Sequence, residues 1–189
     1  MYPNAKIVWI DAHIDINNGA TSPSGNMHGM PMAFLSGDCE GIDKPTHNPA
    51  TDVVYFGIRS FEEGEDVLVK QYKTPIIKSE ECDADNIPAA IKRITDHFPI
   101  DDSSQPIWIS FDIDGLDQRE FESTGTPELQ GLSYKFVRNL LKELVPRAVG
   151  MDLTEINFDL APNEETKKKD MARAREIVED IVSWVPKRN

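Results

Sequence analysis

Short apolar runs recur along the chain between stretches of polar and turn-forming residues, and they predict strands. The runs are rich in Val, Ile and aromatic side chains and are bounded by Pro, Asn, Asp or Gly. Continuous runs of this kind are typical of strands that are buried on both faces of a sheet. We expect strands over residues 6–11, 52–58, 74–78, 106–113 and 147–153.

Apolar residues at helical spacing predict helices between and after these strands. One helix includes residues 87–94, and another includes residues 136–144 with Ser133 as its N-cap. A third runs from about residue 164 to residue 184. Because strands and helices alternate, the pattern indicates parallel βαβ units and an α/β fold with a parallel sheet.

Two acidic stretches lie where predicted strands end. Asp11, His13 and Asp15 follow the first strand, and Asp112 and Asp114 end the fourth. Residues two apart on a strand share a face, so each set of side chains points one way. In parallel sheets ligands bind at the carboxyl ends of the strands. Carboxylates with one imidazole suit a hard divalent cation such as Mn²⁺, and the sequence therefore predicts a metal site here.

A plainer interpretation is that the aspartates cap their strand ends and that His13 lies on the surface. Carboxylate crowding argues against it, because Asp112, Asp114 and the nearby Asp117 would repel one another at the end of a buried strand. A divalent cation offsets that repulsion. Carboxylates that bridge two cations about 3.5–4 Å apart can activate water at neutral pH, so the residues point to metal-assisted hydrolysis.

The composition of the 189-residue chain is ordinary for a globular protein, and residues 1–189 are expected to form a single domain. Its net charge of −13 argues against nucleic acid or an anionic membrane as a partner. No apolar run approaches the ~20 residues that span a bilayer. Cys39 and Cys82 lack the spacing of a metal-binding pair, and no signal peptide is evident, so we expect free thiols and a cytoplasmic location.

Five motifs in order resemble those of the ureohydrolase family, most closely its arginase members. They occupy residues 9–17 (WIDAHIDIN), 24–31 (SGNMHGMP), 110–117 (SFDIDGLD), 124–127 (TGTP) and 152–157 (DLTEIN). The resemblance implies a three-layer α-β-α fold with a mainly parallel sheet and a binuclear manganese centre. It also implies hydrolysis of L-arginine to L-ornithine and urea, by a metal-activated hydroxide that attacks the guanidinium carbon.

The resemblance assigns expected roles to residues of this chain. The expected metal ligands are Asp11, His13, Asp15, Asp112 and Asp114, with Asp11 and Asp112 bridging both ions. The expected catalytic residues are His28 as a proton shuttle, Asp114 as a proton relay and Glu155, which orients the guanidinium. The expected substrate-binding residues are Asn17, Ser24 and Asn26 for the α-carboxylate, Glu62 and Glu65 for the α-amino group, and Thr126 and Glu155.

The chain also departs from the family pattern. The family's earlier Gly-Gly-Asp-His segment, whose histidine binds one manganese, does not occur in this sequence, and neither His47 nor His97 lies in a comparable motif. We therefore expect a partial family domain that lacks the first strands, with an open apolar sheet edge and weaker binding of the second ion. Glu62 stands where arginases commonly carry Asp.

Three functions remain open from the sequence. The first is a manganese-dependent arginase, and the second is another guanidino hydrolase of the agmatinase type. The third is a catalytically impaired arginase-like protein that binds a metal or a partner. Neutral donors at Ser24 and Asn26 favour arginine over agmatine, which has no carboxylate. The expected partner is a small guanidino substrate, and a homo-oligomer is possible.

Overall fold

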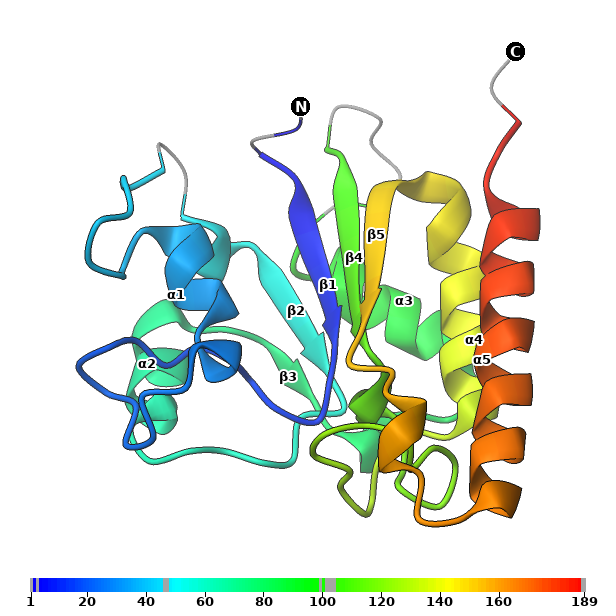
Figure 1. Cartoon of the computed structure of the whole chain (residues 1–189). Coiled ribbons are helices and arrows are strands. Elements are labelled where there is room, and N and C mark those ends of the chain that lie inside the picture. The colour runs from blue at the N-terminus through cyan, green and yellow to red at the C-terminus, as the bar shows by residue number, and fades with distance from the viewer. Residues whose placement is uncertain (1, 3, 46–47, 99, 101–104, 188–189) are drawn as a thin grey trace.

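The computed structural model describes residues 2, 4–45, 48–98, 100 and 105–187, and its core is a five-stranded sheet. The strand order is β3-β2-β1-β4-β5, and every pairing is parallel (Figure 1). The strands are β1 (Lys6–Ile10), β2 (Val53–Phe56), β3 (Ile76–Ile77), β4 (Ile107–Asp112) and β5 (Ala148–Thr154). Each lies within one residue of, or inside, a predicted strand, and the predicted α/β fold is confirmed.

Helices cover both faces of the sheet, which gives the three layers that the resemblance implied. One face packs against α3 (Ile87–Thr95), α4 (Tyr134–Leu144) and α5 (Glu164–Trp184). This layer forms the larger core, in which side chains of β1, β2 and β4 meet the apolar stripes of the three helices. Ser133 caps α4 as predicted, since its hydroxyl accepts a hydrogen bond from the Phe136 amide at 3.1 Å.

Two further helices, α1 (Pro31–Ser36) and α2 (Glu65–Tyr72), pack on the other face and were not predicted. Three glycines and two prolines in residues 17–32 predict an irregular loop, and α1 begins at the end of that stretch. α1 has six residues and α2 has eight, and both are shorter than the windows of about 11–18 residues over which helical periodicity can be recognised. Met32 of α1 and Leu68 of α2 nevertheless reach the same core cluster as Trp9 and Tyr55.

The face that carries α1 and α2 is less covered over β4 and β5. Trp108 of β4 is 39 % exposed, and every described residue of β5 is at least partly exposed. β5 forms one edge of the described sheet, and β3 forms the other. Among the described residues, none of the helices has the length and apolar character that a membrane crossing requires.

A buried carboxylate fastens α5 to the loop that follows β4. Asp170 of α5 is 0 % exposed, and one of its oxygens accepts bonds from the amides of Glu122 and Ser123 at 3.0 and 2.9 Å. The Ser123 hydroxyl donates to the same oxygen at 2.7 Å. The carbonyl of Ser123 in turn accepts a bond from the Asn157 amide at 2.8 Å, so one aspartate orders the segments after both β4 and β5.

We expect Asp170→Ala to lower the free energy of unfolding by about 2–4 kcal/mol, because two amides and a buried hydroxyl lose their acceptor. Denaturant unfolding measures the change. The matched control is Glu179→Ala on the same helix, which removes an exposed ion pair with Arg175 and should cost about 0.5 kcal/mol or less. Equal losses in the two variants would contradict the role assigned to Asp170.

Candidate metal centre

The two acidic motifs start from adjacent and similarly built strand ends. β1 and β4 are paired in parallel with Ile10 opposite Phe111, so the next residues along, Asp11 and Asp112, leave the sheet side by side. Each aspartate then accepts a hydrogen bond from the amide two residues on, which is His13 for Asp11 (2.7 Å) and Asp114 for Asp112 (2.9 Å). Local turns of this type are what Asp favours outside regular structure.

The two turns touch each other directly. The Ala12 amide donates to Oδ1 of Asp114 at 3.1 Å, which joins the loop after β1 to the turn after β4. Gly115 makes this approach possible, because a Cβ atom there would lie 2.9 Å from the Asp11 amide nitrogen. The sheet register and one glycine thus bring residues about a hundred positions apart into one cluster.

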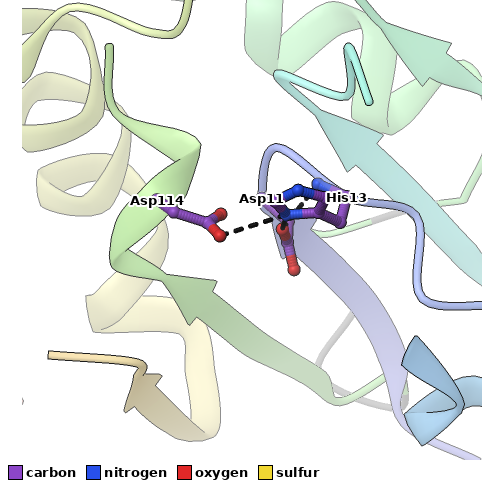
Figure 2. Close-up of side chains that lie close together, drawn as sticks. All are labelled: Asp11, His13 and Asp114. Carbon is purple, nitrogen blue, oxygen red and sulfur yellow. Dashed lines mark hydrogen bonds and ion pairs between the residues drawn. The ribbon is translucent and has the colours of Figure 1, made fainter. Parts of the chain in front are cut away.

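Asp11, His13 and Asp114 form a compact group of ligand atoms (Figure 2). Nδ1 of His13 lies 3.1 Å from Oδ2 of Asp114 and 3.7 Å from Oδ1 of Asp11, and the ligand atoms of the three residues all lie within 4.8 Å of one another. Two carboxylates and one imidazole nitrogen at this spacing fit a single divalent cation of the Mn²⁺ class.

The cluster carries more negative charge than its own hydrogen bonds stabilise. Burial raises the pKa of Asp11 to about 7, against hydrogen bonds from His13 and Trp9 that lower it. Burial also raises the pKa of Asp112 to about 9, with a further rise from the charges of Asp11 and Asp114. Acids that resist ionisation in this way are short of positive charge, which a divalent cation could supply.

His13 provides part of that positive charge itself. Burial opposes its charged form, but the carboxylates of Asp11 and Asp114 outweigh burial and raise the pKa of His13 to about 10. Burial likewise opposes ionisation of Asp114, but the bond and charge of His13 prevail and lower the pKa of Asp114. The proton on Nδ1 therefore lies where a metal ion would bind, and an ion would have to displace it.

The remaining two predicted ligands, Asp15 and Asp112, lie beside the compact group and outside it. Asp112 uses one oxygen for the Asp114 amide, and its other oxygen lies 3.4 Å from the Thr154 hydroxyl. Asp15 is partly buried and has a left-handed backbone with φ 54°. Burial raises the pKa of Asp15 to about 8, and the charge of Asp11 raises it further.

A cavity of about 530 Å³ opens over the cluster, and all three predicted catalytic residues line it. His28 is exposed in a short 3₁₀ turn (Met27–Gly29), and Glu155 is exposed directly after β5 with φ 63°. Both line the cavity together with the acidic cluster. A second cavity of about 730 Å³ shares Asp11, His28 and Glu155 and extends along the less covered sheet face past Trp108.

Glu62 organises several of the predicted substrate-binding residues. Nδ2 of Asn17 donates to Oε2 of Glu62 at 2.8 Å, and the Ser24 hydroxyl donates to Oε1 at 3.4 Å. The backbone amide of Asn26 donates to the Ser24 hydroxyl at 3.3 Å. The neutral donors of this loop therefore already hold a carboxylate, which belongs to the chain itself.

Glu65 and Thr126 also make contacts within the protein. Glu65 is 3 % exposed, and its oxygens accept bonds from the amides of Ile16 (3.2 Å) and Glu62 (2.7 Å). The Thr126 hydroxyl donates to Oδ2 of Asp114 at 3.1 Å. The structure thus places Thr126 against the cluster, and it places Glu65 beneath the loop that carries Asn17.

Sequence reasoning missed three residues that support the cluster. The indole Nε1 of Trp9 donates to Oδ2 of Asp11 at 2.9 Å, Gly115 permits the contact between the turns, and Arg59 holds the backbone around Asp114. A signal existed for Trp9, since it lies two residues before Asp11 on the same face of β1. Of the other histidines, His97 is exposed after α3, and His47 lies outside the described residues.

Comparison with known proteins gives a consistent result. A family model described as the arginase family matches residues 1–179. Arginase-1 of Mus musculus is 33 % identical over 178 residues, which cover 89 % of this chain and 55 % of that protein. Mitochondrial arginase-2 of Mus musculus is 34 % identical over 192 residues, which cover 96 % of this chain and 53 % of that protein. The chain thus spans about half the length of these curated relatives.

Solved structures match in fold as well. The arginase of Bacillus subtilis superposes with a TM-score of 0.77 at 30 % identity, over 95 % of this chain and 63 % of that one. The Entamoeba histolytica arginase solved in complex with L-ornithine gives a TM-score of 0.75 at 30 % identity, over 94 % of this chain and 62 % of that one.

We expect the metal-free protein to lose at least about 2 kcal/mol of stability between pH 5 and pH 9. The acids Asp11, Asp15 and Asp112 have folded pKa values raised above 3.8, so their stabilising contribution is complete below about pH 4 and is lost as pH rises through about 7 to 9. His13 adds a loss between pH 6.5 and about 10, whereas the lowered pKa of Asp114 matters only at acidic pH.

Denaturant unfolding in the presence of a chelator, repeated across this pH range, measures the loss. When the chelator is replaced by Mn²⁺, the denaturant midpoint of unfolding should rise more at pH 8 than at pH 6, because Mn²⁺ binding requires the deprotonated acids. Asp112→Asn serves as the control, since it removes one titrating group and should flatten the profile. A free energy of unfolding that rises between pH 6 and pH 9 would contradict the raised pKa values assigned to these acids.

Proposed function

Because the chain belongs to the arginase family, we propose that it serves the Mn²⁺-dependent hydrolysis of L-arginine to L-ornithine and urea. The observation that carries the proposal is the compact Asp11–His13–Asp114 group at the floor of an acid-lined cavity. A guanidinium cation is the kind of substrate that such a cavity attracts. The relatives to which this chain is similar at 30–34 % identity include arginase-1 and arginase-2 of Mus musculus and the arginase of Bacillus subtilis.

Asp11, His13 and Asp114 would hold the cation, and Asp15 and Asp112 would complete its ligands from beside the group. When bound, Mn²⁺ supplies Lewis-acid activation of water at neutral pH. The chain fixes these side chains before any ion arrives, because the Trp9 indole, the Ala12 amide and the Thr126 hydroxyl each hold one carboxylate oxygen. Ligands held in this way lose little conformational freedom on binding.

Substrate and proton handling fall to the residues at the cavity wall. A carboxylate presents two acceptors that match the planar donor fork of a guanidinium, which is the role we propose for the exposed Glu155. Asp114 lies between His13 and Thr126, where its carboxylate can receive a proton and pass it on. His28 stands exposed on the cavity wall, and an imidazole is suited to exchanging protons with water.

One observation favours a guanidino substrate without a carboxylate as the second candidate. The Glu62 carboxylate already occupies the Asn17 and Ser24 donors that the arginase resemblance assigns to the substrate's α-carboxylate. Arginine would have to displace Glu62 from these donors and would meet its negative charge. Agmatine carries no carboxylate and avoids that competition.

We expect the purified protein with excess Mn²⁺ to release urea from L-arginine. Asp114→Asn should lower the rate by about a hundredfold or more, because it removes a ligand and the proton relay together. Asp66→Asn is the matched control, since Asp66 is exposed on α2 and forms a surface ion pair with Lys70. A urea assay gives the readout. Mn²⁺ binding without any urea would instead support the non-catalytic metal-binding interpretation.

We expect Glu62→Asp to lower KM for L-arginine by about three- to tenfold, because the shorter side chain releases the Ser24 hydroxyl for the substrate. The KM for agmatine should stay within about twofold of the starting value. Steady-state kinetics on both substrates measures the difference. An equal change for arginine and agmatine would show that Glu62 does not compete with the substrate carboxylate.

A further inference from the structure

Within the described part of the chain, the guanidinium of Arg59, just after β2, donates to backbone carbonyls alone. Nε donates to Leu129 at 2.9 Å, and Nη1 donates to Gly57 and Gly115 at 3.0 and 3.3 Å. Nη2 donates to Asp114, Leu116 and Glu128 at 2.8, 2.9 and 3.0 Å. One side chain therefore joins the end of β2, the turn after β4 and the loop that follows Thr126.

The backbone of Arg59 is fastened to the other ligand loop. Its amide donates to the Ala12 carbonyl at 2.9 Å, and the amide of Ser60 donates to the same carbonyl at 3.0 Å. Ala12 lies between Asp11 and His13, so the main chain of Arg59 is bonded to the first ligand loop and its side chain to the second. Among the residues the structure describes, no other side chain bonds the Asp114 carbonyl.

Arg59 is partly buried, and the backbone carbonyls around its guanidinium replace the water that burial removes. Burial lowers the pKa of Arg59, and the charges of Asp114 and Glu128 oppose that shift. The planar fork directs five N–H groups into fixed directions, which a lysine ammonium cannot reproduce. Room for the fork comes from Gly131, where a Cβ atom would lie 2.6 Å from Nη2.

The bonds of Arg59 to both loops determine where the side chain of Asp114 lies. Its carboxylate reaches the Ala12 amide, Nδ1 of His13 and the Thr126 hydroxyl only if the turn after β4 keeps its distance from the loop after β1. Arg59 bonds both of these backbones. We propose that Arg59 is a positioning residue that sets the affinity of the Asp11–His13–Asp114 group for a divalent cation, an inference that rests on the metal-dependent function proposed above.

The test compares Mn²⁺ binding by the intact chain with binding by Arg59→Met and Arg59→Lys. The dissociation constant follows from the electron paramagnetic resonance signal of free Mn²⁺, measured well below each variant's unfolding temperature. We expect the constant to rise at least tenfold in both variants, and the visible absorption of bound Co²⁺ to change as the ligand geometry relaxes. Arg59→Lys keeps the charge and serves if Arg59→Met does not fold.

Arg138→Lys is the matched control, because Arg138 of α4 also makes a multidentate contact, with Asp180 and Glu176 of α5. It should lower the unfolding temperature and leave both the Mn²⁺ constant and the Co²⁺ spectrum unchanged. Unchanged binding in the folded Arg59 variants would overturn the positioning role alone. Failure of the unaltered protein to bind Mn²⁺ would overturn the proposed function, and the role of Arg59 with it.

Discussion

The constraint on which the rest of the site depends is the concentration of buried negative charge at two neighbouring strand ends. Asp11, Asp112 and Asp114 are at most 8 % exposed and lie beside one another, so each disfavours ionisation of the next. Backbone amides, the Trp9 indole and the Thr126 hydroxyl hold individual oxygens, but none of these groups carries a full charge. Only a cation completes the balance, whether it is the protonated His13 or a metal ion in its place.

The sheet sets the spacing of these charges. Parallel pairing of β1 with β4 fixes Asp11 beside Asp112, and the same local turn then places His13 and Asp114 two residues further on each strand. A one-residue slip of register would send one set of ligands to the opposite face. Once the strand register is fixed, Gly115 and Arg59 set how closely the turn after β4 approaches the loop after β1.

Much of this arrangement follows from the sequence. Local apolar patterns predict the five strands and the three longer helices. The rule that ligands bind at the carboxyl ends of parallel strands predicts that the two acidic motifs meet. Both can therefore be applied to a single sequence. The helices α1 and α2 were not predicted, because segments of six and eight residues are too short to show a clear helical spacing of apolar residues. The role of Arg59 could not be predicted for another reason. Its partners are backbone carbonyls from three segments, and every residue type has a carbonyl, so the sequence does not identify them.

The predicted ligands differ in how firmly the fold holds them. Asp11 follows an interior strand flanked by β2 and β4, and Asp114 is tied to Ala12, Thr126 and, through its backbone, Arg59. Asp112 instead has its second oxygen near Thr154, which belongs to β5 at the edge of the described sheet. An edge strand pairs on one side only, so we expect β5 to open more readily than β4 and to affect Asp112 before Asp11. The group around His13 is therefore the stiffer half of the ligand set, and whatever steadies β5 also steadies Asp112.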